Sequence, residues 1–307
     1  MKITITGANG FVGRAISNEL SKKFKIKKIV RNSHVKRENI FEIGDICSLP
    51  DLKEVLVDTD VLIHCIGVSN LKKKNYSLFD LINFDATKNL AEQAVKYNVK
   101  RFIYISTFKV YGENCHINKP LSSDTFCKPY SKYGISKLKA EKKLLDISNK
   151  TDLEVVIIRC PLIYGGVLKG NLLLLSKLIK LNLPLPLKNI NNKRSFLAID
   201  NLVSFIFLCI NYQKTPNAKN QIFSISDNED FSTTELIKKI SNFLNKKIVL
   251  FRFPKFFFRF LFVLLNKKTT YNSLFDSLYV RCNKANKLLD WQPKTSMENQ
   301  LNKRNYN

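Results

Sequence analysis

Short apolar runs rich in β-branched residues alternate with longer amphipathic stretches through the first half of the chain. The short runs predict strands, and apolar residues spaced three and four apart predict helices. Because such alternation is typical of crossover units, we expect an α/β fold with a parallel sheet covered by helices on both faces. The predicted strands are Met1–Thr6, Ile26–Arg31, Val61–Ile66, Arg101–Ser106 and Val155–Arg159, and the predicted helices are Phe11–Lys23, Leu49–Leu56, Leu81–Asn98 and Tyr130–Asn149.

The regular alternation ends near residue 165. Farther along, the pattern predicts a loop and an apolar helix over Gly165–Leu187, helices over Asn201–Asn211 and Thr233–Asn245, and a short strand over Gln221–Ile225. We therefore expect residues 1–165 to form one domain, to which residues 195–225 return. Residues 166–307 would mainly form a smaller C-terminal α/β lobe.

The stretch FRFPKFFFRFLFVLLNKK, Phe251 to Lys268, combines aromatic and basic residues. Its apolar core is shorter than the roughly 20 residues that a membrane-spanning helix needs, and Arg259 interrupts it. One interpretation, which we favour, is a helix buried between lobes or subunits. The other is an interfacial helix, in which Phe251–Leu265 makes peripheral contact with the inner face of a membrane.

The composition allows one large or two modest domains with a full core, because the chain has 307 residues and 45% hydrophobic content. The net charge of +26 raises the question of a nucleic acid or membrane partner. However, the lysines are spread from end to end, and no nucleic-acid-binding motif accompanies them. We therefore expect no nucleic acid partner, and we interpret the charge as a field that concentrates small phosphate-bearing molecules.

Three further features concern the compartment and metals. The chain runs from Met1 directly into a strand pattern, without the apolar run and cleavage site of a secretory signal. The seven cysteines are scattered, odd in number and never in a C-x-x-C pair, which suits a reducing compartment. The three histidines are dispersed, so we expect no metal site. Together these features predict a cytoplasmic protein.

Three glycines in ITITGANGFVG follow the first predicted strand and open the first predicted helix. At such a junction glycine permits a tight turn, a close backbone approach to a pyrophosphate and close packing of helix on strand. The helix N-terminus adds N–H groups and the positive end of its dipole. The motif therefore predicts a Rossmann-type doubly wound sheet that binds a dinucleotide. The predicted cofactor residues in this turn are Gly7, Asn9, Gly10, Phe11, Val12 and Gly13.

The end of the second predicted strand should lie near the adenosine ribose, where an acidic residue favours NAD and a basic residue favours NADP. The sequence there is KIVRN, so Arg31 favours NADP over NAD unless it is only a solvated strand end. After the third strand, IGDI places Asp45 and Ile46 near the expected position of the adenine ring. Asp45 could therefore contact the adenine ring, or it could instead cap the helix that follows. The sequence leaves both roles open.

Tyr133 and Lys137 lie four residues apart in YGISK on a predicted basic helix, so their side chains share one face. A free phenol has a pKa near ~10, and a neighbouring ammonium lowers that pKa by favouring the phenolate. The pair can therefore act as an acid/base device. Ser106 and Thr107 end the strand FIYIST and place hydroxyls at the carboxyl edge of the sheet, where ligands of open α/β sheets bind.

Together these motifs resemble the extended short-chain dehydrogenases/reductases, in the group of nucleotide-sugar epimerases and dehydratases. TGANGFVG is similar to the opening glycine motif of that family, STFKVYGE to the strand with its catalytic Ser or Thr, and YGISK to its Tyr-x-x-x-Lys. IIRCPLIYGG, KRSFLAIDNL and NKANKLLDWQP resemble the segment over the nicotinamide, the arginine motif of the substrate lobe and the C-terminal signature. The resemblance covers nearly the whole chain and implies a smaller lobe that holds a sugar nucleotide.

The resemblance implies roles for individual residues. Thr107 would hydrogen-bond the reacting oxygen of the sugar, Tyr133 would move its proton, and Lys137 would hold the nicotinamide ribose and lower the tyrosine pKa. Asn83, in NFDATKNL, would lie near the cofactor. The substrate-binding residues that the resemblance implies are Lys109, Lys169, Asn171 and Arg194.

The two residues after Thr107 bear on the reaction. Similar dehydratases carry Asp-Glu there, an acid and a base, whereas this chain carries Phe108 and Lys109. A phenylalanine cannot run acid–base chemistry, so 4,6-dehydration is not expected. A fucose-synthase-type role is also disfavoured, because Lys109 stands where those enzymes have a cysteine.

The resemblance then implies NAD(P)-dependent hydride transfer at C4 of a UDP-sugar. One form is a 4-epimerase of the UDP-Glc/UDP-GlcNAc type, similar to UDP-glucose 4-epimerase, in surface polysaccharide biosynthesis. The alternative is a 4-ketoreductase of a UDP-4-keto-6-deoxy-HexNAc. A non-catalytic dinucleotide-binding regulator or scaffold remains a candidate of another class. Relatives dimerise through a four-helix contact, so a homodimer through the Leu81–Asn98 and Tyr130–Asn149 helices is also implied.

Overall fold

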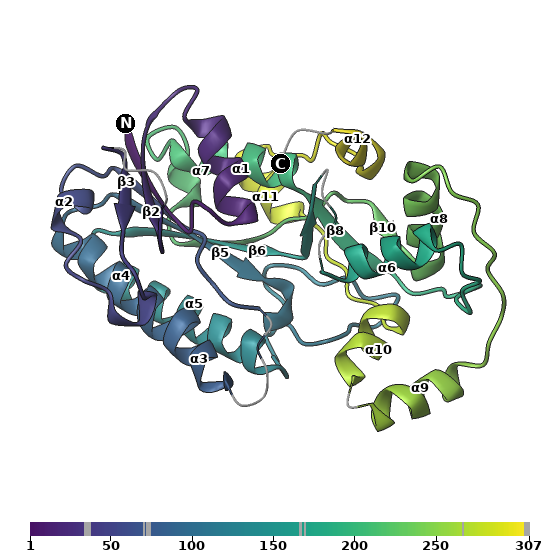
Figure 1. Cartoon of the computed structure of the whole chain (residues 1–307). Helices are drawn as coiled ribbons and strands as arrows, with labels where there is room; N and C mark the ends of the chain where they lie inside the picture. The colour runs from purple at the N-terminus through teal and green to yellow at the C-terminus, as the bar shows by residue number, and fades with distance from the viewer. Residues whose placement is uncertain are drawn as a thin grey trace.

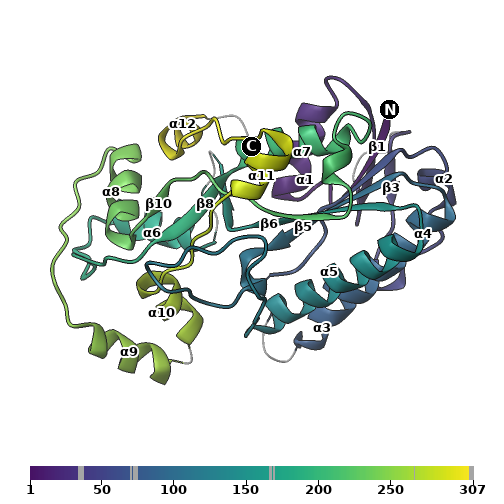
Figure 2. The same ribbon diagram turned by 180° about the vertical axis from the view of Figure 1, so that it is seen from behind.

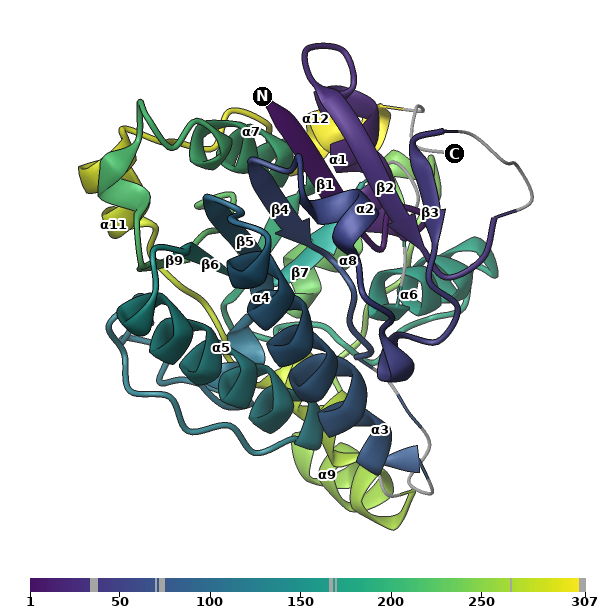
Figure 3. The ribbon, with the colours of Figure 1, turned by 90° about the vertical axis from the view of Figure 1, so that its left-hand side faces the viewer.

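The computed structural model describes residues 1–33, 38–69, 71, 75–165, 168, 170–265 and 267–303. Within these ranges, seven parallel strands form one sheet in the order β3-β2-β1-β4-β5-β6-β9 (Figures 1 and 3). The chain leaves β1 in opposite directions toward β2 and β4, which creates a topological switch point beside β1. The expected doubly wound parallel sheet is therefore confirmed. Its strands are β1 (Lys2–Thr6), β2 (Lys25–Val30), β3 (Ile40–Glu42), β4 (Val61–His64), β5 (Arg101–Thr107), β6 (Glu154–Cys160) and β9 (Gln221–Ser224).

Helices cover both faces of this sheet (Figures 1 and 2). Successive residues of a strand point to opposite faces, so Ile103 of β5 packs on one side and Phe102 and Tyr104 pack on the other. One face carries α1 (Phe11–Leu20), α7 (Ile199–Ile210) and α11 (Asn283–Leu289), and the other carries α2 (Lys53–Leu56), α4 (Ala86–Lys96) and α5 (Lys132–Lys150).

The predicted helix Leu49–Leu56 is shorter in the structure, where α2 begins only at Lys53. Proline disfavours the helical conformation in the residue before it. Leu49, which precedes Pro50, accordingly has an extended ψ of 122°. The residues before it form a 3₁₀ turn, Ile46–Ser48, and residues 49–52 are not helical.

The predicted helix Leu81–Asn98 is composite. It begins earlier, as α3 (Ser77–Asp80), passes through the π-helical segment Leu81–Asp85, and continues as α4. π-Helical turns are rare and often occur at functional sites. The segment therefore draws attention to Asn83, which lies within it.

A second, three-stranded sheet lies in the smaller part of the molecule, in the order β10-β8-β7 (Figure 1). The sequence pattern did not predict these strands, because each has only two to five residues and little alternation. The strands are β7 (Leu162–Tyr164), β8 (Arg194–Ala198) and β10 (Asp230–Phe231), and the helices around them are α6 (Gly170–Lys180), α8 (Thr233–Phe243), α9 (Lys255–Leu264), α10 (Lys268–Phe275) and α12 (Met297–Asn302).

The helix α9 differs from the interpretation that we favoured. None of its ten residues is buried, and it lies at the outer edge of the smaller part (Figures 1 and 2). Burial between lobes is therefore wrong for this segment. Only two of its side chains, Phe258 and Phe262, are half-buried, and both pack on α10. In the described ranges no helix combines the length and the apolar content needed to cross a membrane.

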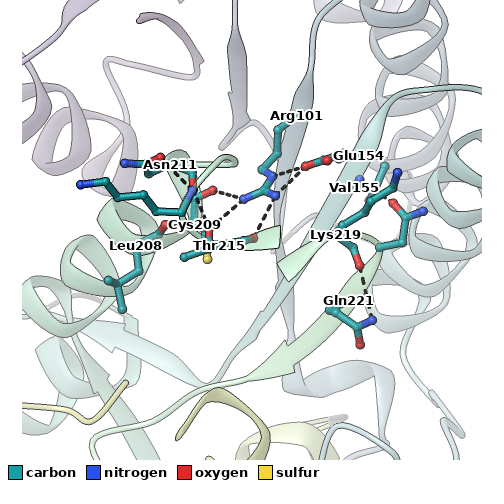
Figure 4. A network of polar contacts seen from close by, with 11 residues as sticks. Arg101, Glu154, Val155, Leu208, Cys209, Asn211, Thr215, Lys219 and Gln221 are labelled. Atoms are coloured by element: carbon teal, nitrogen blue, oxygen red, sulfur yellow. Dashed lines mark hydrogen bonds and ion pairs between the residues drawn. The ribbon is translucent and has the colours of Figure 1, made fainter. Parts of the chain in front are cut away.

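A fully buried arginine fixes the amino end of β5 (Figure 4). Arg101 Nε donates to Glu154 Oε2 at 2.8 Å, which joins β5 to the start of β6. Its Nη1 donates to Cys209 O at 2.7 Å and its Nη2 to Thr215 O at 3.1 Å. These bonds tie β5 to the end of α7 and the following loop, so the strand that ends in Thr107 is anchored at its other end.

Candidate active site

The glycine turn between β1 and α1 has the geometry that a pyrophosphate site requires. Gly7 adopts a φ of +67°, in the left-handed region that favours glycine. A Cβ added to Gly13 would lie 2.2 Å from Gly7 O, so only glycine lets α1 approach the turn this closely. Gly10 is the N-cap of α1, and no side chain in the described ranges caps this helix. The positive end of the helix dipole is therefore left for an anion.

The other predicted residues of the turn have mainly packing roles. Phe11 and Val12, in the first turn of α1, are half-buried and pack on the hydrophobic core. Asn9 Nδ2 donates to Asn32 O at 3.3 Å, which joins the glycine turn to the end of β2. Arg31 is exposed at that end of β2. The structure thus places Arg31 at the end of β2, beside the glycine turn, and its role toward a cofactor stays a prediction.

Asp45 lies close enough to Arg31 to interact with it electrostatically. Hydrogen bonds from Cys47 lower the pKa of the Asp45 carboxyl, and the positive charge of Arg31 lowers it further. Asp45 is the N-cap of the 3₁₀ helix Ile46–Ser48 and accepts from Cys47 N at 3.1 Å. The capping role that the sequence left open is therefore present. Ile46 follows it and is half-buried.

Thr107 and Tyr133 come from different elements and meet at the carboxyl edge of the sheet. Thr107 is the last residue of β5, and its Oγ1 accepts from Lys109 N at 3.2 Å. Tyr133 lies in the first turn of α5, where its side chain hydrogen-bonds with that of Thr107. A Cβ added to Gly134 would lie 2.5 Å from Lys109 O. Glycine at position 134 therefore lets α5 begin directly against the turn that follows β5.

The pKa of Tyr133 differs from the expectation. The sequence predicted that Lys137 lowers the pKa of the phenol, but burial raises it to about 12, and the hydrogen bond with Thr107 offsets only part of that rise. The prediction is wrong because the Lys137 ammonium is directed at the backbone, where Nζ donates to Ile105 O at 2.6 Å. Tyr133 is thus a protonated phenol at neutral pH.

Lys137 is buried, with 3% of its surface exposed. Its Nζ lies 3.9 Å from the centre of the Tyr104 ring, a cation–π contact. Burial lowers the pKa of Lys137 to about 7, while the nearby Glu141 raises it. Near neutral pH, Lys137 is therefore present in both its charged and its neutral form.

Glu141 is a site residue that the sequence analysis missed. It lies four residues after Lys137 and accepts a hydrogen bond from Ser106 Oγ. Its Oε2 lies 2.7 Å from Arg159 Nη2, and both side chains are almost fully buried. Tyr133, Lys137 and Glu141 are each four apart and share one face of α5, and this spacing is the signal that would have identified it.

Asn83 joins three elements around Lys137. Its Oδ1 accepts from Val68 N at 2.9 Å, and its Nδ2 donates to Val68 O and to Ser136 Oγ, each at 3.0 Å. A Cβ added to Gly67 would lie 3.1 Å from Asn83 Oδ1 and 3.8 Å from Lys137 Nζ. The loop after β4, the π-helical segment and α5 therefore meet at one point, and the cofactor role of Asn83 stays a prediction.

Two predicted substrate residues contact the same helix of the smaller part. Arg194, at the start of β8, donates from Nη1 to Asn272 O at 3.3 Å and to Asp276 O at 3.1 Å. Asn171 Nδ2 donates to Ser273 Oγ at 3.3 Å. Both residues thus lie against α10 or its carboxyl end. Lys169, the third, lies outside the described residues.

Lys109, the remaining predicted substrate residue, is paired with Glu113 through its Nζ and the Oε2 of that carboxylate. Glu113 is buried, and its Oε1 has no hydrogen-bond partner among the residues that the structure describes. The positive charge of Lys109 is therefore already compensated. Its backbone has the clearer role, because Lys109 N and O position Thr107 and the start of α5.

Metal ligands do not gather anywhere in the described part of the chain, where no group of three or more His, Cys, Asp or Glu side chains could hold an ion. His64, on β4, is buried between Thr6 Oγ1 at 2.7 Å and Thr87 Oγ1 at 3.0 Å. Burial lowers the pKa of His64 to about 3, so it is a neutral structural residue.

Comparison with known proteins gives the class of the protein. Residues 3–225 match the NAD dependent epimerase/dehydratase family. The chain is 34% identical over 304 residues to the UDP-glucose 4-epimerase of Vibrio cholerae, a match that covers 96% of this chain and 92% of that protein. It is 28% identical over 257 residues to the N-acetyl-alpha-D-glucosaminyl-diphospho-ditrans,octacis-undecaprenol 4-epimerase of Escherichia coli O157:H7, covering 82% and 75% of the two chains. The chain therefore belongs to the NAD-dependent epimerase/dehydratase family, as the resemblance of its motifs implied.

Solved structures support the same fold. The UDP-glucuronic acid 4-epimerase of Bacillus cereus, in complex with NAD, aligns with a TM-score of 0.78 at 22% identity over 98% of this chain and 94% of that one. The UDP-glucose 4-epimerase of Thermotoga maritima, with UDP-glucose, aligns with a TM-score of 0.76 at 20% identity over 98% and 96%. At these identities the alignments establish the fold.

Proposed function

We propose that this protein is a 4-epimerase that acts by hydride transfer at C4 of a UDP-sugar of the UDP-Glc or UDP-GlcNAc type, in surface polysaccharide biosynthesis. The observation that carries the proposal is the meeting of Thr107, Tyr133 and Lys137 at the carboxyl edge of the sheet. The Vibrio cholerae relative, which is named for this reaction and matches 96% of the chain, supports it. Phe108, which stands where similar dehydratases carry an acid and cannot run acid–base chemistry, argues against dehydration.

Each side chain has a defined part in such a reaction. A bound oxidised nicotinamide would supply the hydride acceptor for C4 and a positive charge that lowers the pKa of Tyr133. Tyr133 would take the proton of the C4 hydroxyl and return it after the sugar turns over, while Thr107 hydrogen-bonds the same oxygen. Lys137 would hold the nicotinamide ribose, the other role that the resemblance implies for it. Arg194 and Asn171 would hold the diphosphate, so that only the sugar turns.

The cofactor in this proposal is NAD or NADP at the glycine turn. The guanidinium of Arg31 favours a 2′-phosphate, and therefore NADP, whereas the carboxylate of Asp45 beside it repels one. The NAD in the Bacillus cereus structure supports NAD for a protein of this fold. Competition between NAD and NADP for binding to the purified protein would show whether the charge of Arg31 or that of Asp45 decides the cofactor.

The carrier of the sugar is the open part of the proposal. The Escherichia coli relative is named for a sugar joined through a diphosphate to undecaprenol, and a UDP-sugar presents a diphosphate at the same position. Arg194 and Asn171 would recognise that shared group in either substrate. The activity test therefore includes both carriers.

The test is incubation of the purified protein with UDP-Glc, UDP-GlcNAc, a lipid-linked GlcNAc diphosphate and a UDP-4-keto-6-deoxy-HexNAc. Formation of a C4 epimer without net consumption of dinucleotide supports the epimerase. Stoichiometric consumption of added NADPH with the keto sugar alone supports the 4-ketoreductase instead. Dinucleotide binding without turnover of any substrate would support the alternative of a non-catalytic regulator or scaffold.

The proposal extends to assembly, domain organisation and location. α4 and α5 lie side by side on one face of the sheet, and their outer surfaces would form a four-helix contact in a homodimer (Figure 3).

We place the dinucleotide-binding domain at residues 1–165 with the return at 195–225, and the substrate lobe mainly at 166–307. A cytoplasmic location is proposed from the scattered, unpaired cysteines, which suit a reducing compartment. Sedimentation of the purified protein tests the dimer.

A further inference from the structure

One face of α9 is apolar and exposed to solvent. The half-buried side chains Phe258 and Phe262 hold the helix on α10, with ring centroids 5.1 Å from Phe275 and 6.3 Å from Tyr271. At 3.6 residues per turn, the exposed apolar residues of α9 occupy an arc of roughly 160°. These residues are Phe256, Phe257, Phe260, Leu261, Val263 and Leu264, and they are between 47% and 71% exposed. We call them the α9 apolar face.

Scattered exposed apolar residues are normal, but a contiguous apolar surface on the order of several hundred Å² marks an interaction site. The α9 apolar face has six large side chains on ten consecutive residues, which is an area of that order. The helix also lies at the outer edge of the molecule, where a large flat partner can reach it (Figures 1 and 2). The face therefore needs a partner that covers apolar groups.

The charge around the α9 apolar face is of one sign. Lys255 and Arg259 are exposed, four residues apart, and lie along one border of the apolar arc. From Phe251 to Phe275, a stretch that includes α9 and α10, the sequence contains five Lys or Arg residues and no Asp or Glu. The partner must therefore be apolar within and anionic at its surface, which is the chemistry of an anionic lipid bilayer.

We propose that α9 binds peripherally to an anionic lipid bilayer, with its apolar face among the acyl chains and its basic residues at the headgroups. A second copy of the chain fits less well. A two-fold contact brings the same patch against itself, and here it would press two clusters of positive charge together. The proposal goes beyond the proposed reaction and does not depend on it.

This contact would place the substrate side of the molecule next to the bilayer. The helix α10, on which α9 packs, supplies the carbonyl of Asn272 that accepts from Arg194 Nη1. Lys268, the first residue of α10, has its Nζ 5.7 Å from the centre of the Tyr130 ring, three residues before Tyr133. A membrane-bound α9 would therefore hold the substrate lobe within reach of membrane-borne molecules.

Vesicle binding tests the proposal with the full chain and with neither sugar nor dinucleotide present, so its outcome is independent of the proposed reaction. The protein is sedimented with vesicles of phosphatidylcholine alone and with vesicles that contain roughly one third phosphatidylglycerol. We expect at least about tenfold stronger partitioning to the anionic vesicles, and a marked loss when salt is raised from about 0.1 M to about 1 M.

Two matched variants locate the contact. Val263 in α9 and Val57 at the end of α2 are 58% and 55% exposed, so Val263→Asp and Val57→Asp place a carboxylate at equally exposed positions. Val263→Asp should weaken binding to anionic vesicles about tenfold or more, and Val57→Asp should leave it unchanged. Thermal unfolding confirms that both variants are folded. Should Val263→Asp fail to fold, the double variant Lys255→Gln with Arg259→Gln tests the same surface through its charge.

Several outcomes overturn the proposal. They are no binding of the wild-type protein to anionic vesicles, equal binding to neutral and anionic vesicles, or equal loss of binding in both valine variants. A lipid-free oligomer that Val263→Asp dissociates into smaller species would show that a second copy covers the α9 apolar face.

Discussion

Glu141 lies one helical turn after Lys137 on α5, and both side chains are buried. The carboxylate of Glu141 also pairs with Arg159 at 2.7 Å, so it balances two cations behind the carboxyl edge of the sheet. Its negative charge raises the pKa of Lys137 against the effect of burial. The three residues form a charged support beneath the hydroxyls of Thr107 and Tyr133.

The first prediction concerns this support. Glu141→Gln should lower the free energy of unfolding by about 3–5 kcal/mol, because it leaves the buried guanidinium of Arg159 unpaired. Denaturant unfolding measures the effect. Asp146→Asn, which removes an exposed ion pair with Lys150 on the same helix, is the control and should stay close to wild type. Equal effects of the two substitutions would show that the buried pair does not support the site.

The second prediction is a pH dependence of stability. Because burial lowers the pKa of Lys137 from 10.5 to about 7, the unfolded chain binds more protons than the folded protein between these pH values. The wild-type free energy of unfolding should therefore rise from pH 7 toward pH 10, relative to Lys137→Met, by up to about 1.4 kcal/mol per pH unit. Below pH 7 both states hold the proton, so the difference should level off.

Urea unfolding of the two proteins across this pH range measures the difference in slope. Lys132→Met removes an exposed lysine from the same helix and should keep the slope of the wild type. If Lys137→Met also kept it, Lys137 would not titrate near pH 7 in the folded protein.

The third prediction concerns the proton carrier. Tyr133→Phe should reduce kcat by about 10²–10⁴-fold, because the phenol is the group that moves the proton of the C4 hydroxyl. Dinucleotide binding should remain, since the glycine turn is untouched. Tyr130→Phe removes the hydroxyl of an exposed tyrosine three residues earlier and should retain turnover. Full activity of Tyr133→Phe would assign proton transfer to another group.

The fourth prediction concerns the glycine turn. Gly13→Ala places a Cβ 2.2 Å from Gly7 O, so α1 must move away from the turn. We expect at least about tenfold weaker dinucleotide binding by calorimetry, together with a lower unfolding temperature. Asn18→Ala, at an exposed position of the same helix, should change neither quantity. Wild-type affinity in Gly13→Ala would place the pyrophosphate elsewhere.

Much of the larger part of the molecule could be predicted from the sequence, because strands buried on both faces are nearly continuous apolar runs. The glycine turn, Thr107 and the Tyr133–Lys137 spacing were also visible, since each depends on a local motif. The predicted helix boundaries were wrong where local backbone preferences changed the structure. This happened at Pro50 and in the π-helical segment Leu81–Asp85.

Features set by distant residues could not be predicted. The Arg159 partner of Glu141 is 18 residues away, and the α10 carbonyls that bind Arg194 are about 80 residues away. The pKa of Tyr133 depends on burial, which no motif encodes. The exposure of α9 was mispredicted for a related reason, because an apolar helix for the core and one for an external partner have similar sequences.

The most direct test of the account follows the hydrogen at C4 of the sugar. The wild-type protein is incubated with each UDP-sugar and with the lipid-linked sugar in D₂O, and the epimer is examined by NMR. If Tyr133 exchanges only the hydroxyl proton and the carbon-bound hydrogen moves as a hydride within the closed site, C4 of the product should keep protium. Deuterium at C4 of the epimer, or the absence of any epimer although dinucleotide binds, would contradict the account.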